Sequence, residues 1–414
     1  MRVVVLGAGL LGVASAYYLQ QLGHEVTVVD RHATPAAKAR GRVDAGVAAA
    51  TTRLLQQSAA RRAARAKWAG LYVGLRRRFA RLLDGAIGAP PKSRPIEHLV
   101  RLGTYSRESA RALRDEAGVP PRARNAGLLS FYTDATAFDA RKARASHWRA
   151  LGCEERLLSA DEALRIEPAL EAARSALAGA TYVPDDLARD PAQFAASLVF
   201  LCRAAGVRFL TQHTVLSLKE RAGRIEHVEF LDADGQHGVL RGEAYVLALG
   251  IGSVTHAEKL RIAMPLRFLR EYIATMPIKD PSRAPRVMLR DKQGKLRIRR
   301  IETPAGDRLQ VSGSVRASLD EHGEPDSDRF DAMLRRIETL LPEVADTERA
   351  SLETAVHAVS RSGLPMIGKT RLRNLFLNTA PGAQGWINAC GAGKSIARIV
   401  SGLRPEVAFA FRGA

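Results

Sequence analysis

The sequence predicts an α/β protein that combines a Rossmann-like nucleotide-binding domain with a second domain built on an antiparallel sheet. Residues 1–30 read as a strand, a glycine-rich turn, a helix and a second strand. From Met264 to about Val315, polar and apolar residues alternate, which is typical of antiparallel strands. Near the C-terminus, a strand at Leu375–Asn378, a glycine-rich turn and a helix from about Gly393 repeat the first pattern.

The first turn carries the residue types that a dinucleotide requires. Arg2–Leu6 forms an apolar strand, and Gly7, Gly9 and Gly12 follow with the spacing G-x-G-x-x-G. Gly7 permits a tight turn, Gly9 lets a pyrophosphate approach the backbone, and Gly12 lets the helix pack closely on the strand. The helix N-terminus then presents free N–H groups and the positive end of its dipole to the phosphates.

An acidic residue closes the second strand of this unit. Asp30 follows the apolar strand Val26–Val29 and lies 18 residues after Gly12. At this place it can accept hydrogen bonds from a ribose and would repel a 2′-phosphate. A strand, helix and distal acid around the glycine turn favour a bound dinucleotide over a turn without a ligand.

The middle of the chain is predicted to alternate between helices and strands. In order, we expect a polar basic loop to Val43, helices to Glu116, a strand at Gly127–Tyr132, helices at Phe138–Leu151 and Ser159–Ile166, a helix ending at Ala205, strands at 207–210, at 213–218, around Gly235 and at 244–250, and a helix at Asp328–Leu341. Within the alternating stretch, Arg286 to Arg300 predicts a hairpin around Asp291–Gly294 with an exposed cationic face.

The chain is strongly basic. It has 63 Lys and Arg against 43 Asp and Glu, a formal net charge of +20, which attracts anionic lipid, nucleic acid or an acidic partner. The densest basic cluster, Arg61–Leu83, has helical spacing with one apolar and one cationic face. Such a helix can lie on an anionic bilayer or pack on the core with a solvated basic face. The sequence shows no nucleic-acid-binding motif.

Three further observations bear on location. The sequence contains no run of 18 uncharged apolar residues, and its first strand begins at residue 2, so we expect a cytoplasmic protein without a signal peptide. Cys153, Cys202 and Cys390 are far apart, which argues against a disulfide framework or a structural zinc site.

Motifs at both ends of the chain are similar to those of one flavoprotein family. Met1–Gly9, Gly12–Ala16 and Gly23–Arg31 resemble the N-terminus of the bacterial FAD-dependent D-amino acid dehydrogenases, small-subunit type, in the D-amino acid oxidase superfamily. Asn374–Thr379 and Gly385–Gly391 resemble the C-terminal part of the same family. Segments between these ends, such as Glu167–Leu170, align in order, so the resemblance covers nearly the whole chain, most weakly between residues 35 and 94.

The resemblance implies a Rossmann-like FAD-binding domain formed by residues 1–60, 160–258 and 350–414, and an antiparallel-sheet substrate (cap) domain formed by 61–159 and 259–349. It implies that FAD is bound at Gly7, Gly9, Leu11, Gly12, Asp30, Arg31, Ala45, Gly46, Val215, Gly250, Gly382, Gly385 and Trp386. The implied reaction moves a hydride from Cα of an amino or imino acid to flavin N5. Electrons then pass to a quinone or another carrier, which suits a protein peripheral on the inner face of the cytoplasmic membrane.

The sequence departs from the family pattern near the implied substrate. Arg270-Glu271-Tyr272 stands where the family has Lys-Gly-Tyr, and Asp44 and Pro381 replace an Asn and a His. The family's carboxylate-binding Arg is His357 here, and Arg361 could replace it only if the loop shifts by four residues. The expected catalytic residues are Tyr272, Arg270, Arg361 and His357.

These departures leave alternatives open. Tyr272 is also consistent with a core residue, His357 with a surface residue and Arg361 with a solvated cation. At the level of function, an amino or imino acid oxidoreductase competes with a catalytically silent FAD-binding subunit, and the C-terminal turn disfavours an NAD-linked dehydrogenase. Glu271, if it faces the flavin, would favour a cationic substrate and repel acidic ones, and the loss of the expected Arg predicts weak activity on D-alanine.

Overall fold

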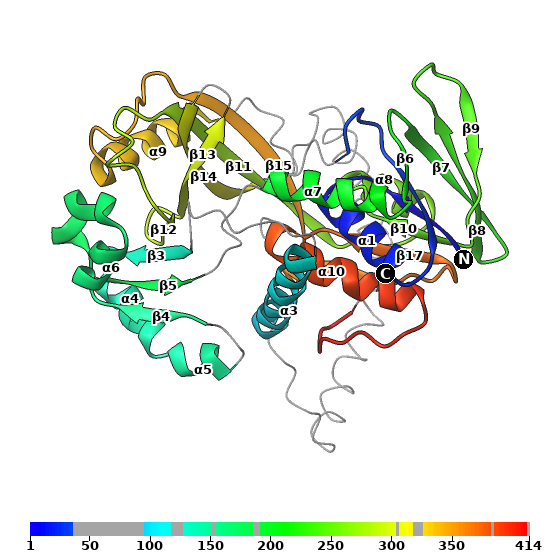
Figure 1. Ribbon diagram of the computed structural model, residues 1–414, viewed down its shortest axis with the longest axis horizontal. Coiled ribbons are helices and arrows are strands. Elements are labelled where there is room, and N and C mark those ends of the chain that lie inside the picture. Colours follow the sequence, from blue (N-terminus) through cyan, green and yellow to red (C-terminus); the bar gives the residue numbers. More distant parts are fainter. Residues whose placement is uncertain are drawn as a thin grey trace, which may run out of the picture.

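The computed structural model describes residues 1–35, 95–116, 127–150, 154–184, 191–303, 306–317, 326–381 and 385–411. Their strands form three sheets, with the orders β16-β17-β10-β1-β2-β6, β15-β11-β14-β13-β12-β3-β5-β4 and β7-β8-β9. The six-stranded and eight-stranded sheets lie side by side and form the two halves of the molecule (Figure 1). We call the eight-stranded sheet the cap sheet.

The helices are α1 (Leu10–Gln21), α3 (Pro95–Glu116), α4 (Ala135–Lys142), α5 (Ala145–Ala150), α6 (Ala160–Ile166), the 3₁₀ helix η1 (Pro168–Ala176), α7 (Pro191–Ala204), α8 (Gly252–Lys259), α9 (Ser327–Leu340) and α10 (Gly385–Val400). The strands are β1 (Arg2–Leu6), β2 (Glu25–Val29), β3 (Leu128–Tyr132), β4 (Arg156–Leu158), β5 (Gly179–Val183), β6 (Arg208–Leu210), β7 (Thr214–Arg221), β8 (Arg224–Leu231), β9 (His237–Leu240), β10 (Ala244–Leu247), β11 (Leu266–Pro277), β12 (Met288–Asp291), β13 (Leu296–Thr303), β14 (Gly306–Ala317), β15 (Ser351–Ser360), β16 (Met366–Lys369) and β17 (Leu375–Thr379).

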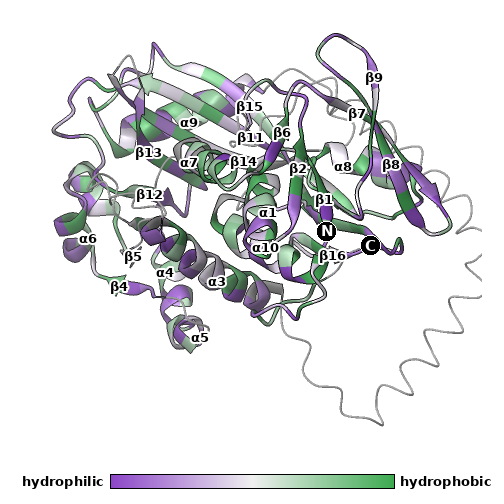
Figure 2. Cartoon of the chain, turned by 45° about the vertical axis from the view of Figure 1, so that its right-hand side comes forward, coloured by the Kyte–Doolittle hydropathy of each residue, from purple (hydrophilic) through white to green (hydrophobic). Residues whose placement is uncertain are grey.

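The six-stranded sheet is parallel except for its edge strand β16. Its strands are short apolar runs, as expected for strands buried on both faces. On one face of this sheet, α1 and α10 pack so closely that a Cβ at Gly393 would lie only 2.7 Å from the backbone of Ala14. Banded colouring of α3 in Figure 2 shows its amphipathic character, and its buried Leu102 and Leu113 join the same core.

One face of the cap sheet is apolar and the other is polar. Buried side chains on alternate strand positions pack against α6, η1 and α9, and Phe330, Met333 and Ile337 of α9 belong to this core. The β12–β13 hairpin predicted from the sequence is confirmed, with Asp291 opposite Leu296. We call the face opposite α9, which carries Glu271, Arg297 and His357, the open face.

The structure corrects several expectations drawn from the sequence. Helix α10 begins at Gly385 rather than about Gly393, and the segment expected as one helix from Phe138 to Leu151 contains two, α4 and α5. Strands β5 and β15, which lie within the expected FAD-domain ranges 160–258 and 350–414, pair in the cap sheet. Helix α3, which lies within the expected cap range 61–159, contributes to the core beside α1 and α10.

The basic segments give two different outcomes. The cationic face expected to be exposed between Arg286 and Arg300 is partly buried at Arg290, Arg297 and Arg299. The amphipathic segment Arg61–Leu83 lies outside the described residues. Across the described ranges, none of the helices combines the length and apolar character that crossing a membrane requires.

Candidate active site

The glycine turn forms a cradle with one open side. Gly7 has a positive φ of 105° and donates its N–H to the Val29 carbonyl at 2.8 Å, which joins the turn to the second strand. A Cβ at Gly12 would lie 1.8 Å from the Gly7 carbonyl oxygen, so this position must be glycine for α1 to pack here. A Cβ at Gly9, in contrast, would meet none of the described residues within 4 Å. The backbone of Gly9 is therefore accessible to a ligand.

The first turn of α1 suits a phosphate. Gly9 is the N-cap residue, no side chain from the described part of the chain caps the helix, and the first turn contains no acidic residue. Free N–H groups and the positive end of the helix dipole therefore face the open side of the cradle. Leu11, the second residue of the helix, is buried and contributes its backbone to this turn.

Asp30 connects the turn to the end of β2. Its carboxylate accepts the backbone N–H of Ala8 at 2.7 Å and bonds the backbone N–H and ring Nδ1 of His32 at 2.8 and 2.7 Å. The side chain is 14% exposed, and a carboxylate has lone pairs for further donors such as ribose hydroxyls. Arg31, the next residue, is exposed.

Three segments distant in sequence surround this turn: the start of β7, the segment after β10 and the C-terminal segment that follows β17. The His213 N–H bonds the Asp30 carbonyl at 2.9 Å, which brings the start of β7 and hence Val215 beside the end of β2. Ala248 packs on Gly7, and Gly250 follows it with a positive φ of 60° and open space at its Cβ position.

The C-terminal segment reaches the same region. Thr379 at the end of β17 donates to the Gly250 carbonyl at 3.0 Å. Gly385 and Trp386 are the first two residues of α10. The candidate cofactor residues Ala45, Gly46 and Gly382 lie outside the described residues, as does Asp44.

The open face of the cap sheet carries a buried charged cluster. The Glu271 carboxylate of β11 bonds Nε2 of His357 on β15 at 2.6 Å and pairs with the Arg297 guanidinium of β13. The side chains of Glu271 and His357 are 9% and 12% exposed. Burial alone would raise the pKa of Glu271, but the His357 hydrogen bond and the charge of Arg297 lower it to about 2. Glu271 is therefore ionised, and its charge is compensated on two sides.

This cluster lies close to the junction between the two large sheets. Val359, two residues after His357, forms an isolated β-bridge with Pro381, at the start of the segment that leads into α10. The open face near His357 therefore adjoins the C-terminal part of the candidate cofactor site.

The other expected catalytic residues lie elsewhere. Tyr272 is buried on the face that α9 covers, with its ring 5.0 Å from that of Phe330, so its position is that of a core residue. Strand alternation places Arg270 on the same side as Tyr272. Arg361 is exposed in the turn after β15, and its backbone N–H bonds the Pro265 carbonyl. Of the four, the structure brings only His357 to the buried cluster.

Arg297 is a residue of this cluster that the sequence did not indicate as a site residue. It belongs to the basic hairpin, where the local sequence does not distinguish a site arginine from its many neighbouring arginines. The signal that could have found it is the alternation Leu296, Arg297, Ile298, which puts its side chain on the face opposite the core.

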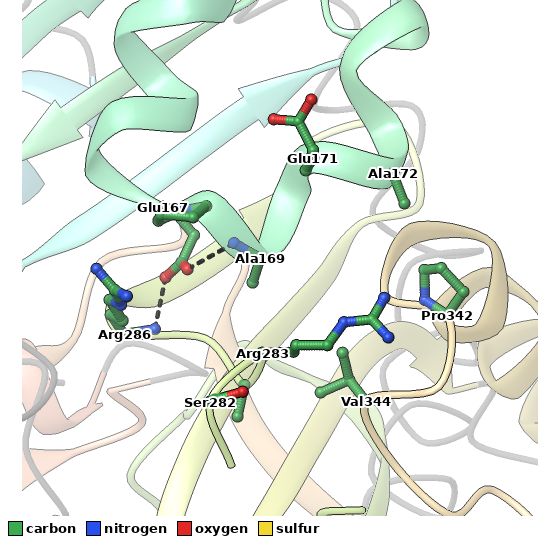
Figure 3. A pocket seen from close by; sticks show the side chains of 11 residues that line it. Glu167, Ala169, Glu171, Ala172, Ser282, Arg283, Arg286, Pro342 and Val344 are labelled. Carbon is green, nitrogen blue, oxygen red and sulfur yellow. Dashed lines mark hydrogen bonds between the residues drawn. The ribbon is translucent and has the colours of Figure 1, made fainter. Parts of the chain in front are cut away.

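A pocket in the cap is separate from these residues. It has a volume of about 140 Å³ and lies between η1 and the segments at 282–286 and 342–344. Figure 3 shows Glu167 beside it, accepting N–H bonds from Ala169 and Arg286. Burial raises the pKa of Glu167 although the backbone donors oppose this effect. Its contacts are those of a residue that stabilises the cap.

Comparison with known proteins gives one consistent family. The family model described as FAD dependent oxidoreductase matches residues 2–399. The chain is 33% identical to the D-amino acid dehydrogenase of Rhizorhabdus wittichii, over 98% of each chain, and 33% identical to that of Dechloromonas aromatica, over 99% of each. Glycine oxidase from Geobacillus kaustophilus has a similar structure, with a TM-score of 0.69, 20% identity and coverage of 99% of this chain and 97% of that chain.

Proposed function

Because the chain belongs to the family of FAD dependent oxidoreductases, we propose that it oxidises an amino or imino acid in the manner of a D-amino acid dehydrogenase. The resemblance predicted from the sequence is confirmed, and so are the α/β fold and the cofactor FAD. The substrate class is taken from the curated relatives, which this chain matches over nearly its full length.

The observation that carries the proposal is the fit of the glycine cradle to a dinucleotide. Open space at Gly9, the uncapped N-terminus of α1 and the Asp30 carboxylate would hold the pyrophosphate and the ribose. When bound, FAD would accept the hydride, one proton with two electrons, that leaves the substrate. The protein's part is to bind and orient the substrate and to handle its amine proton.

His357 is suited to the proton transfer. Its Nε2–H donates to the ionised Glu271 carboxylate, so in the neutral tautomer Nδ1 is the ring nitrogen that can accept a proton. An amino acid loses a hydride from Cα more readily when its amine is neutral, because the lone pair stabilises the developing imine. We assign His357 as the acceptor of that ammonium proton and Glu271 as the residue that fixes its tautomer.

Anaerobic flavin reduction tests the proposal. The purified protein should contain FAD, and a panel of D-amino acids, glycine and imino acids should include compounds that bleach its visible absorbance. Turnover with a dye as the electron acceptor should then give reduced dye, and hydrolysis of the released imino acid by water should give a 2-oxo acid and ammonia from the amino acids that react. A bound flavin that no compound of the panel bleaches would favour the catalytically silent alternative instead.

The electron acceptor and the location belong to the same proposal. A net charge of +20 supports association with the anionic surface of the inner membrane, where quinones are available as acceptors. Reduction of a soluble quinone analogue by the substrate-reduced protein tests the acceptor.

A further inference from the structure

Two backbone hydrogen bonds fasten the loop between β6 and β7 to Asp30. The Asp30 N–H donates to the Leu210 carbonyl at 2.9 Å, and the His213 N–H donates to the Asp30 carbonyl at 2.9 Å. Between these contacts, Gln212 has a φ of 58°, in the left-handed region that is uncommon for a residue with a side chain. Such a conformation persists only where the surrounding contacts determine it, and here it holds His213 beside the acid.

The His213 ring belongs to a pair of rings with a fixed arrangement. Its Nδ1–H donates to the Thr211 carbonyl at 2.6 Å, and its centroid lies 4.9 Å from that of Phe230, with the two planes inclined by 43°. Phe230 in turn lies against Gly238, where a Cβ would come within 2.3 Å of the ring. A hydrogen bond orients one ring and a glycine seats the other. We call His213 and Phe230 the ring pair.

The ring pair lies at the margin of the hydrophobic core. Val215 and Leu218 of the same small sheet pack on the core beneath it, whereas Phe230 is not among the described side chains that do so. Both rings are half-buried, so part of each surface stays uncovered by the described residues. The three-stranded sheet that carries them projects from the edge of the molecule (Figure 1). A half-covered pair of aromatic rings is suited to stack on a flat partner.

The position of the ring pair matches the base end of a dinucleotide. In a site of this type, the pyrophosphate lies at the glycine turn and the ribose hydroxyls bond the acid after the second strand. Strand β2 lies between β1 and β6, so the glycine turn after β1 and the loop after β6 are on opposite sides of Asp30. A cofactor that extends from the turn across Asp30 therefore brings its base toward His213.

We propose that His213 and Phe230 form the surface on which the adenine of FAD stacks. Every base has a π face, and stacking on aromatic side chains contributes substantially to affinity. The inference goes beyond the ribose contact of Asp30, because it assigns side chains to the base. It concerns the binding of FAD alone and does not depend on the proposed substrate.

Release of FAD from the holoenzyme tests the ring pair. The recovery of flavin fluorescence on dilution gives the dissociation constant, which His213→Ala should raise roughly 5- to 100-fold. This variant keeps the backbone N–H that bonds Asp30, so the loop should stay folded. His237→Ala is the matched control, because His237 is exposed on β9 of the same sheet and should leave the constant unchanged. Equal constants in wild type and His213→Ala would overturn the inference.

Exchange with a flavin dinucleotide that carries cytosine in place of adenine separates base recognition from a loss of structure. Cytosine has a smaller π face, so the wild-type protein should prefer FAD. His213→Ala should reduce this preference at least about three-fold, whereas His213→Phe, which keeps a ring, should retain most of it. An unchanged preference in His213→Ala, with weaker binding of both dinucleotides, would overturn the inference. Neither measurement uses a substrate, so a failure here is distinct from a failure of the proposed reaction.

Discussion

At Gly9, the missing side chain leaves space that the protein itself does not use. Its backbone has φ −67° and ψ 173°, which a β-branched residue also adopts, and a Cβ there would contact no atom of the described ranges within 4 Å. Gly9→Val should therefore fold normally but lose the flavin absorbance, because the side chain would occupy the space of the pyrophosphate.

Absorbance at 450 nm and circular dichroism of the purified variant check this prediction. Gly103→Ala in α3 is the control, because its Cβ would make only an ordinary contact of 3.7 Å with Asn388. The control should keep its flavin. A folded Gly9→Val protein with full flavin content would contradict the assignment of the cradle.

Glu271 links the charge of the open face to stability at low pH. Its pKa is about 2 in the folded protein, below the ordinary value of 4.5, so its ionised form contributes stability that is present above pH 4.5 and is lost as the pH falls toward 2. We expect Glu271→Gln to lower the free energy of unfolding by about 3 kcal/mol at pH 7 and by much less near pH 2.

Urea unfolding of wild type and Glu271→Gln at pH 7, 4 and 2.5 measures this difference. Glu25→Gln serves as the control, because Glu25 is exposed on β2 and should change the stability little at any pH. A difference between wild type and Glu271→Gln that stays constant with pH would show that Glu271 is not held ionised in the folded protein.

At the scale of elements, one buried carboxylate holds the cap's 3₁₀ helix to a neighbouring loop. Glu167 is fully buried and accepts the N–H groups of Ala169, Arg286 and Val287. Glu167→Ala would leave three N–H groups without their acceptor, so we expect it to lower the free energy of unfolding by about 3 kcal/mol. Thermal unfolding measures the loss.

Glu171, in the same 3₁₀ helix, provides the comparison. It is exposed and, among the described residues, forms its ion pair with the exposed Arg174, so Glu171→Ala should lower the Tm far less than Glu167→Ala. Similar Tm values for the two variants would show that the buried hydrogen bonds of Glu167 do not stabilise the cap.

Strand β11 shows how alternation separates structure from chemistry. Neighbouring residues Glu271 and Tyr272 lie on opposite faces, one in the charged cluster of the open face and one in the core beneath α9. A motif of three consecutive residues in a strand therefore cannot present all of its side chains to one ligand.

At the scale of the whole molecule, the excess of basic residues predicts salt-dependent binding to anionic surfaces. With a net charge of +20, the protein should sediment with vesicles that contain anionic lipid and stay in solution with neutral vesicles. Each cation near the surface contributes about 1 kcal/mol at low ionic strength. Raising the salt concentration from about 0.05 to about 0.5 M shortens the Debye length from roughly 14 to roughly 4 Å. The higher salt concentration should therefore release the protein from the vesicles. Equal binding to both kinds of vesicle would remove the electrostatic basis for a peripheral location.

The sequence alone determined the dinucleotide unit and the family. Arg2–Leu6, the glycine spacing and Asp30 lie within the first 30 residues, so short-range patterns and the chemistry of glycine were sufficient to predict β1, α1, β2 and the cradle between them. The alternation after Met264 likewise predicted the antiparallel strands and the β12–β13 hairpin, because a strand's period of two is visible locally.

Only the tertiary structure decided which charged residues meet. Glu271 and His357 are 86 residues apart, and their contact depends on the register of β11 with β15, while Arg297 and Arg290 reach the same face through β13 and β12. A shift of one residue in any of these pairings would turn the side chains to the opposite face. Register is set by the packing of the whole sheet against α6, η1 and α9, so no local pattern could distinguish the compensated Glu271 from a free charge.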